Sequence, residues 1–351
     1  MRRILLALLL GTLSLAAAED PFAAPPGLQV FAREATMNQV GTPAKTSSLL
    51  KAIFTPEAQG GLGMVYDDSY TRTVAEAWRD RKANCLTLTA FYISACRSIG
   101  LEARFGESLR VSLWRRVGGL IRNERHVVAI IPSGSLGQQM VADFLPELRR
   151  GSQMIAPMDP KRALALFYSN RAVELLGGLH TQEALAEAQQ SIDVDPSSSV
   201  GLNILGVVQR EQGLPVAAEA SFRQALKVDP KDGAACGNLE ALLRSEGRTA
   251  EAEVYRERGL EVRKDDPYFN AFLAREALEN LDFKEAGSRI KRAIRLLPQE
   301  PEFHLLQARV YLAEGDTKAA IRCLERAQRW ASPEEQARFA SKIALLQGRK
   351  P

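Results

Sequence analysis

A repetition of 34 residues in the second half of the chain limits its fold more than any other feature. Five alanines lie at this spacing, at Ala184, Ala218, Ala252, Ala286 and Ala320. A second column of small residues has the same spacing, at Ser191, Ala225, Gly259, Ala293 and Ala327. A fixed period of roughly 20–50 residues is typical of solenoids, in which each unit buries its apolar face against its neighbours. The repetition therefore predicts a stacked array after about residue 160.

Turn residues on the same grid indicate what each unit contains. Glycines stand at one position of the grid and prolines at another, namely Gly213, Gly247 and Gly315, and Pro196, Pro230 and Pro298. Glycine ends a helix readily because it adopts the left-handed backbone conformation. Proline ends a helix because it lacks a backbone N–H and disfavours helix in the residue before it. Each unit is therefore predicted to be a pair of antiparallel helices, which the small residues allow to approach closely.

The best-formed unit carries a recognisable set of residues. They are Leu202, Leu205, Gly206, Ala218, Phe222, Ala225 and Pro230. This set resembles the tetratricopeptide repeat family, and the resemblance implies an all-α solenoid of five units over residues 160–332. A capping helix and tail are expected over 333–351, because a terminal unit needs a polar outer face. By resemblance the array binds a protein or peptide in its concave groove; alternatively, it only supports the rest of the chain or a homodimer.

The first 18 residues have the pattern of a secretory signal peptide. Arg2 and Arg3 precede an apolar run from Ile4 to Leu15, and three alanines follow at 16–18. The run is too short to cross a hydrocarbon core of roughly 30 Å comfortably, although an uncleaved anchor is the alternative. No later segment approaches 18 apolar residues, so no membrane span is expected after cleavage. We expect an exported, periplasmic protein.

Charge and histidine content exclude several classes of function. The net charge of +4 over 351 residues, with no basic stripe among aromatics, does not favour a nucleic-acid partner. The three histidines, His126, His180 and His304, are too scattered for metal-ligand spacing. We therefore expect no metal and no cofactor. The sequence leaves the oligomeric state open.

Residues 45–155 have a different pattern from the repeats. After a loosely ordered lead-in at 19–44, the stretch NCLTLTAFYISACRSIG predicts a buried helix that Cys85 opens and Gly100 ends. Apolar strands are predicted at 101–114, 124–131 and 138–144. A helix followed by antiparallel strands predicts an α+β arrangement.

Cys85 is the candidate nucleophile of this region. The start of a helix favours thiolate over thiol, and a thiolate that attacks acyl groups needs a base, which a third group orients. His126 is the only histidine before the repeats and opens a strand, and Asp143 lies in the next strand. Neighbouring antiparallel strands can bring these two side chains together. Cys96, by contrast, is interpreted as a core residue, and Trp78 and Asn84 are close enough to Cys85 to be considered as pocket residues.

No disulfide is expected among the four cysteines. Cys85 and Cys96 lie on one predicted helix, where their Cα atoms would be about 16 Å apart, and a disulfide needs less than about 7 Å. Cys236 and Cys323 fall in units that are not neighbours. All four are therefore expected as thiols.

The order of these residues resembles the transglutaminase-like superfamily. A cysteine on a helix leads into Ile99-Gly100-Leu101-Glu102-Ala103-Arg104, and a histidine and an aspartate follow on successive strands. The resemblance covers about 70–147 and implies a papain-like fold. It also implies Cys85 as nucleophile, His126 as general base and acid, and Asp143 as the residue that orients His126.

Two functions follow from this combination. The first is an exported thiol enzyme that cleaves peptide or glutamine-type amides through a thioester, with hydrolysis favoured over crosslinking and the repeats recruiting the substrate. The alternative is a catalytically silent periplasmic adaptor in which only the repeats act. A metal-binding module is a weaker third possibility.

Overall fold

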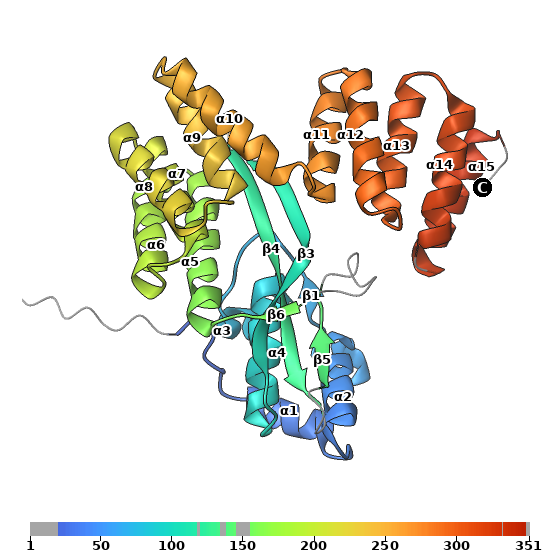
Figure 1. Cartoon of the computed structure of the whole chain (residues 1–351). Coiled ribbons are helices and arrows are strands. Elements are labelled where there is room, and N and C mark those ends of the chain that lie inside the picture. Colours follow the sequence, from blue (N-terminus) through green and yellow to red (C-terminus); the bar gives the residue numbers. More distant parts are fainter. Residues whose placement is uncertain (1–19, 118–119, 134–137, 145–154, 332, 349–351) are drawn as a thin grey trace, which may run out of the picture.

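The structure is a computed structural model, and it describes residues 20–117, 120–133, 138–144, 155–331 and 333–348. The expected signal peptide at 1–18 lies outside the described residues. Most of the described chain is helical (Figure 1). No helix in these ranges is both long enough and apolar enough to cross a membrane.

Short helices and strands come first along the chain. The helices are α1 (Leu28–Thr36), α2 (Thr42–Phe54), the 3-10 turn η1 (Glu57–Gln59), α3 (Val74–Asp80) and α4 (Cys85–Ser98). A two-stranded parallel sheet joins β1 (Val65–Tyr66) to β2 (Lys82–Ala83). A capping box at the start of α3, made by Thr73 and Glu76, satisfies backbone N–H groups that the helix itself leaves unpaired.

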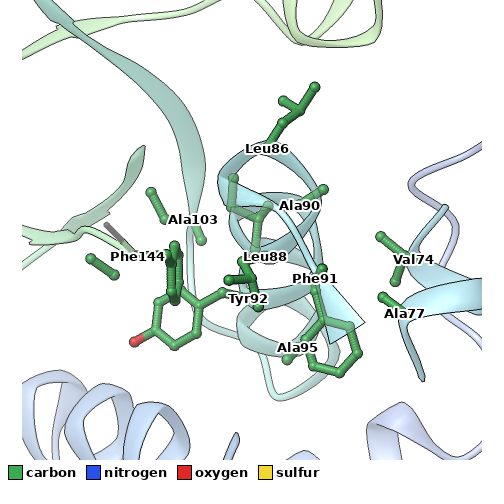
Figure 2. Packing of buried hydrophobic residues seen from close by; sticks show 14 of the residues in the cluster. Val74, Ala77, Leu86, Leu88, Ala90, Phe91, Tyr92, Ala95, Ala103 and Phe144 are labelled. Atoms are coloured by element: carbon green, nitrogen blue, oxygen red, sulfur yellow. The ribbon is translucent and has the colours of Figure 1, made fainter. Parts of the chain in front are cut away.

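Helix α4 lies at the centre of the N-terminal core. Its residues from Leu86 to Ile93 are buried on every side, as expected of a helix that is apolar all round. Figure 2 shows Phe91 on the side of Val74 and Ala77, and Tyr92 on the side of Ala103 and Phe144. The strands and the smaller helices therefore hold α4, and with it Cys85, from several directions.

A four-stranded antiparallel sheet packs against α4. Its order is β5 (Gln139–Ala142), β4 (Leu120–Pro132), β3 (Arg104–Val117) and β6 (Ile155–Pro157). β4 pairs with β5 through Ala129 and Ala142, and β3 pairs with β6 through Glu107 and Ala156. The three predicted strands are present, whereas β6 was not predicted because its three residues carry no alternating pattern.

The expected loose lead-in at 19–44 contains an ordered helix. Leu28 and Ala32 of α1 are fully buried in the core that surrounds α4, and Phe22 packs against the same core. The proline- and alanine-rich composition concealed this because the segment gains its order from tertiary contacts. Residues 28–36 therefore belong to the core.

Ten helices in the described part of the chain form five antiparallel pairs. They are α5 (Pro160–Gly177) with α6 (Thr181–Val194), α7 (Ser199–Glu211) with α8 (Pro215–Val228), α9 (Gly233–Ser245) with α10 (Thr249–Arg263), α11 (Pro267–Glu279) with α12 (Phe283–Leu296), and α13 (Pro301–Ala313) with α14 (Thr317–Trp330). A further helix, α15 (Pro333–Leu346), packs on α14. The five alanines of the first column are all fully buried between paired helices.

The turns inside the pairs share one backbone conformation. Gly213, Gly247 and Gly315 have φ angles of 74°, 77° and 83°. Leu179 and Leu281, at the same position of the other two units, have φ angles of 65° and 62°. All five turns thus reverse the chain in the left-handed region, and in two of them leucine does so without the glycine that the pattern favours.

The sheet and the helical array are in contact along two regions. Leu166 and Phe167 of α5 belong to the same buried cluster as Phe91 of α4. Further along, the β3–β4 hairpin reaches α9 and α11 (Figure 1). The region predicted as α+β over 45–155 therefore shares its buried core with the first repeat.

Candidate active site between the sheet and the repeats

Cys85 is the first residue of α4 and is half-buried. Asn84 caps the helix, since its side-chain oxygen accepts a hydrogen bond from the backbone N–H of Thr87 at 3.0 Å. The sulfur thus lies where the positive end of the helix dipole favours an anion. The other three cysteines, Cys96, Cys236 and Cys323, are buried thiols.

His126 and Asp143 are brought together as predicted from their order in the sequence. The Nε2 atom of the buried His126 lies 2.7 Å from a carboxylate oxygen of Asp143. Nδ1 of His126 is also buried, and it makes no hydrogen bond to the described residues. With its proton on Nε2, the imidazole donates to Asp143 and keeps the lone pair of Nδ1 for another proton.

Strand β4, which carries His126, packs against the helix that begins at Cys85. The hydroxyl of Thr89, one turn after Cys85, donates to the backbone carbonyl of Val127 at 3.3 Å. Val127, Ala129 and Ile131 pack toward α4, so regular alternation would place His126 on the opposite face of the sheet. The pairing of β3 and β4 is irregular at this point, between the pairs Glu107–Val127 and Ser112–Arg125. Such irregularities redirect side chains next to active sites.

A cavity of about 280 Å³ opens where Cys85 meets the repeats. One wall comes from the N-terminal region, with Thr71, Asn84, Cys85, Leu86 and Val127. The other wall comes from the first three repeats and includes Ser169, Asn170, Glu174, Val200, Asn203, Lys231, Asp232 and Arg263. Ligand cavities in proteins often form in this way, between two parts of a fold.

The cavity carries both signs of charge and several amides. Its acids are Asp68, Glu174, Asp232 and Asp266, and its bases are Lys231 and Arg263. Burial lowers the pKa of Arg263 to about 10, so the group stays cationic at neutral pH. Amides at Asn84, Asn170 and Asn203 can both donate and accept hydrogen bonds. This lining suits a polypeptide backbone better than an apolar ligand.

The two further pocket candidates from the sequence have different positions. Asn84 lines the cavity, whereas the ring of Trp78 stacks on Phe91 with centroids 6.2 Å apart. Glu174 and Thr71 line the cavity and were not predicted. They are 103 residues apart in the chain, and neither has a local motif that would draw attention to it.

No histidine of the repeats belongs to the cavity lining. His180 is exposed before α6, and the buried His304 hydrogen-bonds through Nε2 to the carbonyl of Pro298 at 2.8 Å. Within the described ranges, no three histidine, cysteine or acidic residues are placed to hold a metal ion.

Two stretches of the array match a family model. Residues 169–235 and 277–345 each match a model described as the tetratricopeptide repeat. Over these two stretches the helical array contains tetratricopeptide repeats. The prediction from the 34-residue grid is thereby confirmed for these stretches. The matches do not reach residues 70–147, where the transglutaminase-like resemblance stays a prediction.

Several solved structures are similar to this chain, with low TM-scores. PilW, titled a widely conserved type IV pilus biogenesis factor, is 20% identical over 53% of this chain and 86% of its own, with a TM-score of 0.33. PilF of Pseudomonas aeruginosa is 17% identical over 54% of this chain and 87% of its own, also with a TM-score of 0.33. YrrB, titled a TPR protein with an unusual peptide-binding site, is 21% identical over 51% and 92%, with a TM-score of 0.27. No curated protein matches the chain.

Proposed function

We propose that this chain is a protein-binding adaptor that holds an extended segment of its partner in the cavity beside Cys85. The observation that supports this most directly is the composition of the cavity wall, to which the first three tetratricopeptide repeats contribute amides and charges. Repeats of this family typically bind protein partners. The β3–β4 hairpin lies against α9 and α11, and the cavity leaves room for a foreign segment beside α5, α7 and the start of α9.

Peptide selection tests this binding. Random peptides are selected on the full chain, and their affinities are compared between the wild type and Asn170→Ala and Lys231→Ala. Because both side chains line the cavity, we expect losses of about tenfold, or about 1.4 kcal/mol, for each variant. Arg326→Ala on α14, far along the array from the cavity, is the control and should bind as the wild type does. Equal losses in all three variants, or none, would place the binding surface elsewhere.

A second function has a specific observation in its favour, the hydrogen bond between His126 and Asp143. In this function Cys85, His126 and Asp143 act as in a transglutaminase-like thiol enzyme of the periplasm. Nδ1 of His126 takes the thiol proton, and the thiolate attacks the carbonyl carbon of a bound amide. The carbon–nitrogen bond breaks as His126 returns the proton to the departing amine. Water then hydrolyses the thioester, with His126 as the base.

Alkylation of Cys85 separates the enzyme from the silent adaptor. With His126 as its base, the thiol should react quickly with iodoacetamide below pH 7, and His126→Ala should remove this reactivity. Asp143→Asn should reduce it less, because the amide still holds the ring but no longer stabilises its cationic form. If the wild-type rate simply follows that of an ordinary thiol, rising near pH 8.5, Cys85 is not activated and the adaptor alone remains.

A further inference from the structure

Thr71 is a fully buried residue that connects the first repeat to the start of α4. Its backbone N–H donates to both carboxylate oxygens of Glu174, at 2.9 and 3.0 Å, and its hydroxyl lies 2.6 Å from Oε1. On the other side, Nδ2 of Asn84 donates to the Thr71 hydroxyl at 2.8 Å. Glu174 belongs to α5, so these hydrogen bonds join the repeats to the residue before Cys85.

The chemistry of the groups fixes which one donates and which one accepts in each of these hydrogen bonds. The carboxylate of Glu174 only accepts, so the hydroxyl of Thr71 must give it its proton. That hydroxyl then accepts from the amide nitrogen of Asn84, which leaves the amide oxygen for the backbone N–H of Thr87. The first turn of α4 is thus held in one orientation by a carboxylate of the first repeat.

A second contact holds the same loop in place and is not part of this series of hydrogen bonds. The guanidinium of Arg171, on the same helix as Glu174, lies over the ring of Tyr70 at 4.4 Å. One of its nitrogens also approaches the backbone carbonyl of Thr71, at 3.5 Å. Arg171 therefore supports the interface but has no hydrogen bond to the side chains of Thr71 or Asn84 among those described.

We propose that Glu174 is a positioning residue for Cys85. Acting through Thr71 and Asn84, it holds the N-terminal turn of α4 so that the first repeat controls the reactivity of the thiol. The inference rests on the proposed role of Cys85 as a nucleophile. The cavity is lined by all four residues concerned, Glu174, Thr71, Asn84 and Cys85. A segment bound there therefore contacts Glu174, where this series of hydrogen bonds begins, and Asn84, where it reaches α4.

Other charged groups line the cavity that Cys85 lines or belong to the His126 pair, and they must be constant in the test. They are Asp68, Asp232, Asp266, Lys231, Arg263, His126 and Asp143. Thr71→Val leaves all of them in place and has nearly the shape of threonine. It removes the hydroxyl and with it the link from Glu174 to Asn84.

The experiment compares the pH profile of Cys85 alkylation and the amide exchange of residues 85–88 in four full-length proteins. For Thr71→Val we expect alkylation below pH 7 to slow at least fivefold, the profile to move to higher pH, and exchange in the first turn of α4 to speed at least tenfold. Thr71→Ser restores the hydroxyl and should behave as the wild type. Arg171→Met loses the second contact and the ion pair with Glu187 but leaves the hydrogen bonds among Glu174, Thr71 and Asn84 in place. It should lower the melting temperature without changing either readout.

The possible results separate the two proposals. If Thr71→Val folds and leaves both the exchange and the alkylation profile unchanged, Glu174 is not a positioning residue. If exchange increases but the wild-type thiol reacts as an ordinary one, the link exists and the nucleophilic role of Cys85 fails. Should Thr71→Val not fold, Glu174→Met provides the test, since it has a similar length and removes both oxygen acceptors of Thr71; unchanged readouts there would also overturn the inference.

Discussion

At the scale of single residues, the four cysteines differ sharply in their surroundings. Burial raises the pKa of Cys96 to about 12 and also raises the pKa values of Cys236 and Cys323. Cys85 is the half-buried one and lines a cavity.

We expect iodoacetamide to label Cys85 selectively in the folded protein. Thiolate is the reactive form, and the three buried thiols both resist ionisation and lack access to the reagent. Peptide mass spectrometry after brief labelling at pH 7 should find the label on Cys85 alone, and urea should expose all four. Labelling of Cys96 at a comparable rate in the folded protein would contradict this description of the core.

We expect the buried His304 of the last helix pair to make the stability of the chain depend on pH. Burial lowers its pKa from the usual 6.5, and the nearby Arg326 acts in the same direction. A lowered folded-state pKa stabilises the fold above the unfolded-state value, and this contribution is lost as pH falls through the folded-state pKa.

Stability should therefore decrease as pH falls below about 6.5, the usual pKa of histidine, and His304→Gln should flatten that decrease. Glutamine cannot take up a proton and can still donate to the carbonyl of Pro298. Urea unfolding at a series of pH values measures the effect, with His180→Gln at the exposed histidine as the control. An unchanged slope in His304→Gln would show that His304 does not contribute.

At the scale of elements, two turns of the array use leucine where glycine fits better. Leu179 and Leu281 are exposed, so their side chains contribute little to packing, yet both hold a left-handed backbone. We expect Leu281→Gly to stabilise the chain by about 0.5–1 kcal/mol, because relief of this strain exceeds the entropy cost of glycine. Thermal unfolding measures it, with Gly247→Leu as the reverse change; stabilisation by Gly247→Leu would contradict the argument.

The sequence predicts elements well where local patterns determine them. The glycine and alanine columns locate the helix pairs, and the capping helix expected within 333–351 lies at Pro333–Leu346. The helix opened by Cys85 follows from its apolar run and the glycine after it. Helix α1 and strand β6 were not predicted, because α1 is ordered by contacts distant in sequence and β6 by pairing with β3.

The sequence likewise predicts one part of the candidate site and not the other. Cys85, His126 and Asp143 could be chosen from residue type and order, and the pairing of His126 with Asp143 is present in the structure. The link from Glu174 through Thr71 to Asn84 could not be predicted, because nothing in the sequence near residue 71 indicates that residue 174 lies beside it. Tertiary packing alone brings them together.

At the scale of the whole molecule, the first repeat and the α4 region share one core. Phe167 is buried in it, and its ring lies edge-on to that of Phe22 with centroids 5.8 Å apart. Phe303 of α13 is also buried, in a separate cluster formed by the fourth and fifth repeats.

Phe167→Ala should destabilise α4 and α5 together, by about 3–5 kcal/mol. Hydrogen exchange in low urea should show protection lost in both helices, although they belong to different parts of the sequence. Phe303→Ala, which removes a ring of the same size from the later cluster, should leave the protection of α4 unchanged. Loss of protection in α5 alone would mean that the two regions are independent bodies.

The central claim is that a bound segment lies in the cavity against Cys85. It is tested most directly by the alkylation rate of Cys85 when a peptide selected for binding is titrated onto the full chain. We predict that the rate falls as the peptide saturates the protein, and that the same peptide gives much weaker protection with Asn170→Ala. Saturation with an unchanged rate would show that the repeats bind their partner elsewhere and would contradict the account.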